Sequence, residues 1–173
     1  MHNACCIRPL TAPDLPTVLA WRNHPNVRRF MFTQHEISLK EHQNWFEKTN
    51  SDTSKRLLLV EDSTQPIGYV QFNNVKEGGI ANWGFYSCPN RLKGTGQKLG
   101  ITALDYAFQV LLLHKVCGQV IGNNAKSISF HKRLGFREEG KLREHQFVAS
   151  TYYDIYCFGL LSYEWISKNS NQE

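Results

Sequence analysis

Residues 88–97 read Cys-Pro-Asn-Arg-Leu-Lys-Gly-Thr-Gly-Gln, and this stretch decides how the rest of the chain is interpreted. It follows an alternating apolar run at residues 80–88 and precedes a run at residues 97–113 whose apolar residues have helical spacing. This order predicts a strand, a loop with two glycines and a long helix. A helix N-terminus offers unpaired N–H groups and a partial positive charge, so the loop is suited to hold a pyrophosphate.

Two other kinds of phosphate-binding loop are excluded by the spacing of the glycines. Three residues after Gly96 stands Leu99, so the dinucleotide-binding pattern G-x-G-x-x-G is absent. No Gly-Lys-Ser/Thr follows the loop, so it is not a Walker A motif either. When the glycines are considered alone, the loop could equally be an ordinary strand-to-helix turn.

A second motif lies one predicted helix and one predicted strand further along the chain. Residues 124–136 read Asn-Ala-Lys-Ser-Ile-Ser-Phe-His-Lys-Arg-Leu-Gly-Phe, with an Asn suited to begin a helix and a Gly suited to end it. Together the two segments resemble the GNAT superfamily of N-acetyltransferases, in which an R/Q-x-x-G-x-G/A loop is followed by N-x-x-A/S and G-F. The resemblance extends from Ile7 to about Leu161.

The remaining sequence predicts short elements in the order that this resemblance implies. We expect an α/β fold, the GNAT fold, with a central, mostly antiparallel twisted sheet of about seven strands flanked by helices on both faces. Residues 1–173 should form a single domain whose polar tail, 167–173, is loosely ordered. The predicted strands are 5–10, 56–61, 67–75, 80–88, 116–121, 136–148 and 152–160, and the predicted helices are 11–21, 39–48, 97–113 and 124–134.

Composition narrows the class of protein further. The chain has 173 residues, of which 41% are apolar, which suits one compact domain. It has no apolar run of membrane-spanning length and no secretory signal, so we expect a cytoplasmic protein without a membrane partner. The five cysteines include no C-x-x-C pair and are expected to be reduced thiols, mostly in strands, with no metal bound.

The net charge of +5 is compatible with nucleic acid or with any ligand that carries several phosphates. No basic stripe with exposed aromatic residues and no nucleic-acid-reading motif accompanies it, so no nucleic-acid partner is expected. The GNAT resemblance implies acetyl-CoA as co-substrate. By that resemblance the cofactor-binding residues are Phe85, Tyr86, Cys88, Arg91, Lys93, Gly94, Thr95, Gly96, Gln97, Asn124, Ser127, Phe130 and Lys132. For Phe130, packing in the core is the simpler interpretation.

The chain departs from the GNAT pattern at the predicted catalytic residue, His131, because many GNAT enzymes carry Tyr at this position. The departing thiolate needs a proton, and an imidazolium with an ordinary pKa near 6.5 could donate one. Alternatively His131 lies on the helix surface and the acid is elsewhere, or N–H groups alone stabilise the thiolate. Candidates for the base are His24, His35 and Glu36, although His24 could simply cap a helix and the other two could be exposed loop residues.

The acceptor-facing segment, residues 21–42, resembles the bacterial pseudaminic acid pathway N-acetyltransferases, whose acceptor is a UDP-linked amino sugar. That resemblance implies a small-molecule nucleotide-sugar partner. Its arginines could pair with the diphosphate and its aromatic residues could stack on uracil, or they could be a solvated patch and core residues. The expected substrate-binding residues are Trp21, Arg22, His24, Arg28, Met31, His35, Glu36 and Trp83.

Two other functions remain open at this point. A related enzyme in the superfamily acetylates the N-terminal amine of a ribosomal protein, and the basic Arg28-Arg29 pair does not contradict that activity. The chain could also be a non-catalytic acyl-CoA binding module that keeps the glycine loop without the acid. The sequence does not decide the oligomeric state and leaves a homodimer open.

Overall fold

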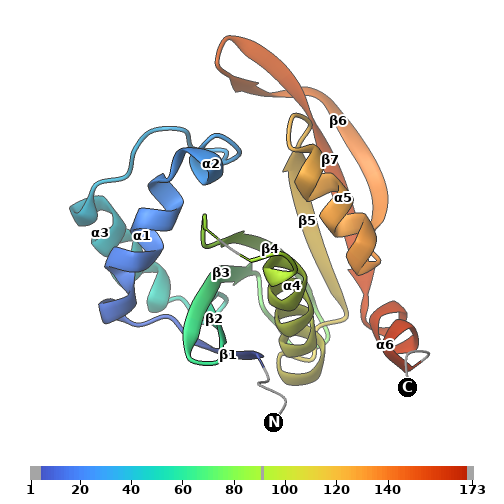
Figure 1. The fold of residues 1–173 in the computed structure, drawn as a ribbon. Helices are drawn as coiled ribbons and strands as arrows, with labels where there is room; N and C mark the ends of the chain where they lie inside the picture. The colour runs from blue at the N-terminus through green and yellow to red at the C-terminus, as the bar shows by residue number, and fades with distance from the viewer. Residues whose placement is uncertain (1–4, 91, 171–173) are drawn as a thin grey trace.

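The computed structural model describes residues 5–90 and 92–170, and its centre is a seven-stranded sheet in the order β1-β2-β3-β4-β5-β7-β6 (Figure 1). All neighbouring strands are antiparallel except β4 and β5, which are parallel. The predicted mixed, mostly antiparallel sheet is therefore confirmed. The strands are β1 Cys5–Pro9, β2 Arg56–Asp62, β3 Gln65–Asn73, β4 Ile80–Ser87, β5 Lys115–Ile121, β6 Arg137–Val148 and β7 Thr151–Leu161.

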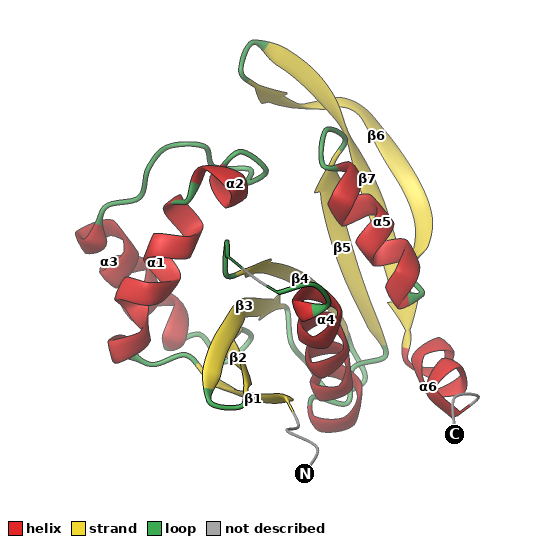
Figure 2. Ribbon diagram, viewed as in Figure 1, coloured by secondary structure: helices red, strands yellow, loops and turns green. Residues whose placement is uncertain are grey.

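Helices cover the sheet in two groups (Figure 2). α1, α2 and α3 lie together beside β2 and β3, whereas α4 lies against β1 to β4, α5 lies beside β7 and β6, and α6 follows β7. None of the helices in the described part of the chain is long and apolar enough to cross a membrane. The helical segments are η1 Ala12–Asp14, α1 Leu15–Asn23, α2 Pro25–Arg28, α3 Leu39–Asn50, α4 Thr95–Asp105, η2 Tyr106–Val110, α5 Ala125–Leu134 and α6 Ser162–Ser170.

The two faces of the sheet belong to different hydrophobic cores, as the two-residue repeat of β2 requires. Leu57 and Leu59 pack with Val18 of α1 in one core. Leu58 and Val60, which point the other way, belong to the larger core that includes the α4 and α5 side chains. Both faces are thus covered by helices, as the sequence predicted.

β4 and β5 are hydrogen-bonded over only part of their length. Residues 80–82 of β4 pair with residues 115–117 of β5. Beyond that point β4 continues beside β3 as far as Ser87, and β5 continues beside β7 as far as Ile121. The two strands therefore diverge and open a wedge in the middle of the sheet.

The long helix predicted at residues 97–113 differs from the structure. The α-helix begins at Thr95 and gives way after Asp105 to one turn of π-helix, η2, and Leu112 then has a positive φ of 52°. A π turn widens the residue spacing and rotates the stripe of apolar side chains. Val110, which belongs to the apolar run that predicted the long helix, is therefore 62% exposed.

Two further segments correct the sequence interpretation. Residues 25–28, which lie outside the predicted helices, form the short helix α2. α6 was not predicted, and it takes residues 167–170 of the expected loose tail into a helix, while 171–173 lie outside the described residues. Trp165 anchors α6 in the core, where its indole N–H donates to Asp105 Oδ1 at 2.9 Å.

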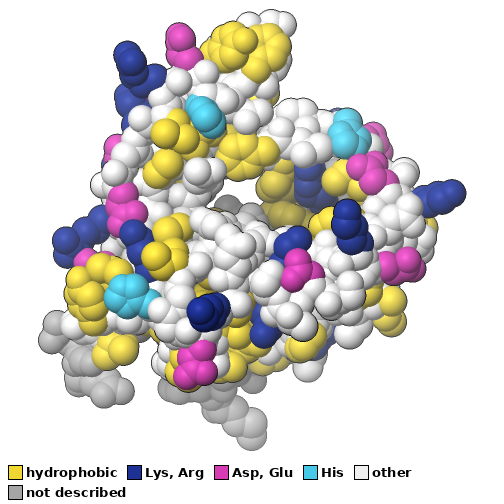
Figure 3. Space-filling view, turned by 180° about the vertical axis from the view of Figure 1, so that it is seen from behind, with side chains coloured by type: hydrophobic (Ala, Val, Ile, Leu, Met, Phe, Trp, Pro, Cys, Tyr) yellow, Lys and Arg dark blue, Asp and Glu magenta, His cyan; other side chains and the backbone are white. Residues whose placement is uncertain are grey.

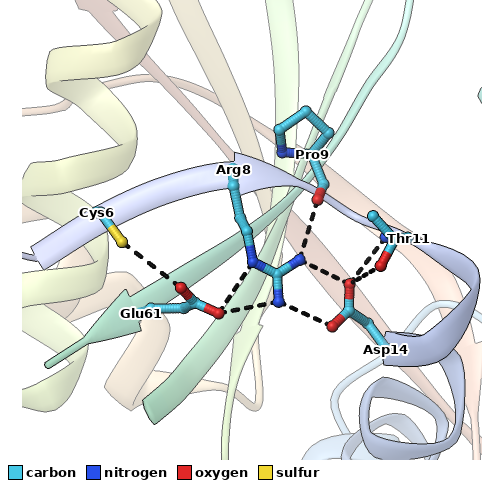
Figure 4. Close-up of polar contacts among 6 residues, drawn as sticks. All are labelled: Cys6, Arg8, Pro9, Thr11, Asp14 and Glu61. Carbon is cyan, nitrogen blue, oxygen red and sulfur yellow. Dashed lines mark hydrogen bonds and ion pairs between the residues drawn. The ribbon is translucent and has the colours of Figure 1, made fainter. Parts of the chain in front are cut away.

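An ion-pair network ties β1 to the start of the helical layer (Figure 4). The Arg8 guanidinium donates to both carboxylate oxygens of Asp14 at 2.8 and 2.9 Å and to Glu61 Oε1 at 2.9 Å. Asp14 also accepts from the Thr11 backbone N–H at 2.8 Å. The Arg8 hydrogen bonds are the main reason that the pKa of Asp14 lies well below its usual range.

Arg8→Met is expected to lower the free energy of unfolding by about 1–2 kcal/mol at pH 7, because Arg8 is about one-third exposed and water screens its pairs. The depressed pKa of Asp14 stabilises the fold above pH ~4, and this contribution is lost as the pH falls. Urea denaturation at pH 7 and pH 3 should show the difference between wild type and variant shrinking at pH 3. Exposed Lys40→Met is the control, and a difference that grows on acidification would contradict the prediction.

Candidate active site

Two adjoining cavities occupy the wedge between β4 and β5. The smaller has a volume of about 370 Å³ and the larger about 980 Å³. Phe30, Met31, Phe85, Asn124 and Ser127 line both, so the cavities form one continuous cleft. The molecule is visibly hollowed near its middle in the view from behind (Figure 3).

The larger cavity lies between the end of β4, the start of α4 and one side of α5. Ten of the predicted cofactor-binding residues line it, namely Phe85, Tyr86, Cys88, Lys93, Gly94, Gly96, Gln97, Asn124, Ser127 and Phe130. Thr95 is buried in the first turn of α4 and does not line it. Lys132 is exposed and pairs with Glu138 at 3.1 Å, and Arg91 lies outside the described residues. The structure thus brings most of the predicted cofactor-binding residues of the two motifs together around one cavity.

Gly94 opens α4 toward this cavity. Its φ of 92° lies in the left-handed region, where a side chain would be strained and glycine is not. The first turn of α4 follows directly, with Gly96 and Gln97 at the cavity wall. The N–H groups and the positive end of the α4 dipole are therefore placed to receive an anion.

The charged residues that line the larger cavity are all cations. Arg29, Lys93, Lys126 and Arg133 contribute to its wall, and no Asp or Glu among the described residues does. Lys126 and Arg133 were not among the predicted cofactor-binding residues. They are seven residues apart, two turns on one face of α5, and that spacing beside the Asn124 motif was the available signal. The cavity suits a ligand with several phosphates.

His131 is buried, at 2% exposure, on the side of α5 that faces β4 and β5. Its Nδ1–H donates to the Ser127 carbonyl oxygen at 2.8 Å, and its Nε2 accepts the Trp83 indole N–H at 3.1 Å. A carbonyl only accepts and an indole N–H only donates, so these partners select the neutral tautomer with the proton on Nδ1. His131 is not the helix-surface residue that one sequence alternative described.

Burial lowers the pKa of His131 to about 4, and the hydrogen bond to Ser127 opposes this shift only in part. At neutral pH the ring is uncharged, and both nitrogens are occupied by protein partners. The prediction that an imidazolium at His131 protonates the leaving thiolate is therefore not supported by this geometry. His131 does line the smaller cavity, as expected of a site residue, and its imidazole joins α5 to β4 across the wedge.

The smaller cavity is enclosed by the loop after α2 and by the diverging strands. Phe30, Met31 and Phe32 form one side, and Asn82, Trp83, Cys117 and Gln119 belong to the strands. Met31 and Trp83 are two of the predicted acceptor residues. Asn82 and Gln119 were not among the predicted residues, because only the register of β4 and β5 brings them to one cavity.

The other six predicted acceptor residues line neither cavity. Trp21 packs against the core between α1, α3 and the sheet. His24 follows the end of α1, as its alternative interpretation held, and its side chain caps the start of α2 by accepting the Asn26 backbone N–H at 3.2 Å. The remaining four hold the loop at residues 29–38 in place: Arg22 donates to the Thr33 carbonyl at 2.8 Å, Arg28 pairs with Glu36 at 3.3 Å, and His35 pairs with Glu41 at 2.8 Å.

The three candidate bases are consequently outside the cleft. His24, His35 and Glu36 are all engaged with neighbouring groups at or near the surface. Among the described residues that line the two cavities there is no carboxylate, and burial raises the pKa values of Cys117 and Tyr86. These two groups are protonated at neutral pH and do not serve as bases.

Comparison with known proteins agrees with this arrangement. The profile of the Acetyltransferase (GNAT) domain matches residues 5–137. The chain is 32% identical over 127 residues to Acetyltransferase PseH of Campylobacter jejuni, covering 73% of this chain and 79% of that protein. It is 27% identical over 172 residues to the Spermidine N(1)-acetyltransferase of Vibrio cholerae, covering 98% and 99%.

A solved structure gives the same result for the fold. The structure of the Vibrio cholerae spermidine N-acetyltransferase in complex with CoA and spermine superposes with a TM-score of 0.85. The two sequences are 28% identical, and the superposition covers 94% of this chain and 98% of the other. All these relatives are acetyltransferases, and the Vibrio cholerae enzyme is named for a polyamine acceptor.

Proposed function

The chain belongs to the GNAT acetyltransferases and is an acetyl-CoA dependent N-acetyltransferase, and we propose that its acceptor is the amine of a UDP-linked amino sugar. The specific acceptor proposed is UDP-4-amino-4,6-dideoxy-N-acetyl-β-L-altrosamine, and the pathway is pseudaminic acid biosynthesis. Two PseH proteins of Campylobacter jejuni, 32% and 31% identical to the chain, support this choice. The non-catalytic alternative is set aside because the family and its named relatives are enzymes.

The charge of the cleft is the observation that favours a nucleotide-sugar acceptor over a polyamine acceptor. Spermidine holds several positive charges at neutral pH, and burying them requires carboxylates or comparable anions nearby. The described residues that line the two cavities include no Asp or Glu, and the larger cavity adds four cations. A nucleotide sugar brings no positive charge that this lining would have to balance, and Arg29, which lies in the wall that adjoins the smaller cavity, is available to attract its diphosphate.

The described residues that line the two cavities include no carboxylate, and this also favours a weakly basic amine as the acceptor. In direct transfer within a ternary complex, the amine attacks the thioester carbonyl as a neutral group, a C–N bond forms and the C–S bond breaks. The nitrogen loses one proton and the sulfur gains one. A ring amine next to electron-withdrawing oxygens is neutral more often at pH 7 than the alkylamines of a polyamine, so it requires less help from a base.

The residues of the larger cavity fit acetyl-CoA as the co-substrate. Lys93, Lys126 and Arg133 supply the positive charge that a pyrophosphate and a further phosphate need. The first turn of α4 adds N–H groups. β4 pairs with β5 only over residues 80–82, so the backbone of Phe85 and Tyr86 lies beyond that pairing and is placed to meet amide groups of the pantetheine arm in the cleft. Acetyl-CoA supplies the activated acetyl group when bound there.

Acetyl transfer to the UDP-linked amino sugar, followed by thiol release, tests the proposal. We expect turnover of this sugar, and competitive inhibition by UDP against it, because the basic cleft favours the diphosphate. Uridine, which lacks the diphosphate, should inhibit at least about tenfold more weakly. Spermidine and an N-terminal ribosomal-protein peptide should be acetylated at less than about 1% of the kcat/KM for the sugar. Efficient acetylation of either, without inhibition by UDP, would assign the enzyme to that acceptor instead.

A further inference from the structure

Four carboxamide side chains lie on one face of three neighbouring strands. In the register of the sheet, Asn73 of β3 stands opposite Asn82 of β4, and Asn82 stands beside Cys117 of β5. Gln71 lies two residues before Asn73 in β3 and Gln119 lies two residues after Cys117 in β5, so both share that face. We call Gln71, Asn73, Asn82 and Gln119 the carboxamide row.

The members of the carboxamide row follow one another from the interior of the molecule toward its surface. The hydroxyl of Tyr69, which is only 4% exposed, donates to Gln71 Oε1 at 2.8 Å. Gln71 Nε2 then donates to Asn73 Oδ1 at 2.6 Å. With its oxygen engaged, Asn73 has its amide N–H groups left to offer toward the neighbouring strand, where Asn82 lies.

Only the outer two members of the row reach the smaller cavity. Asn82 and Gln119 line it and are exposed, whereas Gln71 and Asn73 do not line it. The opposite side of the cavity is apolar, formed by Phe30, Met31 and Phe32. A ligand there meets uncharged hydrogen-bonding groups on one side and aromatic surface on the other, which is the pattern that fits a sugar ring.

Resting on the proposed function, we propose that Asn82 and Gln119 bind the uncharged polar groups of the acceptor sugar and select it against polyamines. A carboxamide both donates and accepts, as a sugar hydroxyl and an N-acetyl group do. An ammonium group only donates and carries a charge that a carboxamide does not balance. Gln71 and Asn73 do not line the cavity, and they act as positioning residues because Asn73 stands opposite Asn82 in the register of β3 and β4.

Gln119→Glu tests the selection directly, because it keeps the shape of the side chain and adds a negative charge. The quantity measured is the ratio of kcat/KM for spermidine to kcat/KM for the UDP-linked amino sugar. We expect this ratio to rise at least about tenfold, since the carboxylate repels the anionic sugar nucleotide and attracts the cation. Gln109→Glu makes the same change on the exposed surface of η2, away from the cleft, and should leave the ratio unchanged.

Asn82→Ala tests the hydrogen bonds without adding charge. We expect KM for the sugar to rise about tenfold, because polar groups of the bound sugar lose their partner. The KM for acetyl-CoA, the inhibition constant of UDP and the melting temperature should stay within the error of the wild-type values. Asn73→Ala should raise the sugar KM by a smaller factor of about three, with kcat unchanged, as expected of a residue that acts through Asn82.

The outcomes for this inference and for the proposed function are separable. A wild-type enzyme that does not acetylate the sugar contradicts the proposed function, whatever the variants do. A wild-type enzyme that acetylates the sugar, with a folded Gln119→Glu variant whose acceptor ratio is unchanged and an Asn82→Ala variant whose sugar KM is unchanged, overturns the carboxamide inference alone.

Discussion

Gly96→Val is expected to lower the affinity for acetyl-CoA at least about 100-fold while the fold is retained. Gly96 lies at the wall of the larger cavity in the first turn of α4. A branched side chain there would keep a pyrophosphate from reaching the N–H groups of that turn. Losing two hydrogen bonds to a charged ligand is enough for an effect of this size.

Calorimetric titration with acetyl-CoA measures this affinity, and circular dichroism checks the fold. Gly140→Val is the matched control, since Gly140 lies on β6 and an added Cβ would meet no atom within 4 Å. Gly96→Ala should fall between wild type and Gly96→Val, because a methyl group blocks less of the approach. Unchanged affinity in a folded Gly96→Val variant would show that the phosphates bind elsewhere.

The glycine loop was predictable because its information is local. The two glycines lie two residues apart between an alternating run and a helical run. This pattern predicts that a helix begins at the end of a strand, whatever the position of the segment in the fold. The same holds for Asn124, whose side chain caps α5 by accepting the Ser127 N–H at 3.1 Å, and for Gly135, which ends α5 with a φ of 103°.

The acceptor side was not predictable in the same way, because its members come together only through strand register. Asn82 and Gln119 are separated by 37 positions in the printed sequence, and neither belongs to a motif. Residues 21–36 suggested charge partners for a diphosphate, yet most of these side chains fasten their own loop. A charged residue near a predicted site can serve the loop that carries the site, and sequence alone does not separate the two roles.

The environment of His131 was missed for a further reason, which is close packing. A Cβ on Gly118 would lie 2.7 Å from His131 Nε2 and 2.8 Å from Trp83 Nε1, so the hydrogen bond between the two rings depends on a glycine in β5. The ring also stacks on Phe158 of β7 with centroids 5.0 Å apart. Residues of three strands therefore bury the imidazole of His131. The helical pattern of α5 alone does not indicate that this side chain is buried.

The second large effect expected is a loss of stability on acidification that depends on His131. Its pKa is about 4 in the folded protein and 6.5 when exposed, so the unfolded chain binds more protons between these values. Stability is unaffected above pH 6.5 and falls as the pH is lowered toward 4, by about 3 kcal/mol in total from this residue. His42, whose pKa is also lowered by burial, adds to the same trend.

Urea denaturation at several pH values, with His131→Leu beside wild type, isolates this contribution. The variant loses the hydrogen bond to Trp83 and should be less stable at pH 7, yet its stability should fall less steeply between pH 6.5 and 4. His145→Leu, at an exposed position on β6, is the control for removing a histidine. Equal slopes in wild type and His131→Leu would contradict the buried, neutral state of the ring.

The same ionisation state separates a positioning role from acid catalysis. A neutral His131 has no proton to lose between pH 6 and 8, so kcat should not fall across that interval through its titration. His131→Phe should then lower kcat without changing the shape of the pH profile, since it disturbs Trp83 and the first turns of α5 and leaves the reacting groups as they are. A wild-type kcat that falls as the pH rises through about 6.5, with that limb absent in His131→Phe, would restore His131 as the general acid. It would also mean that the hydrogen bond between Trp83 and His131 opens during turnover, because only an Nε2 released from the indole could hold a proton for the sulfur.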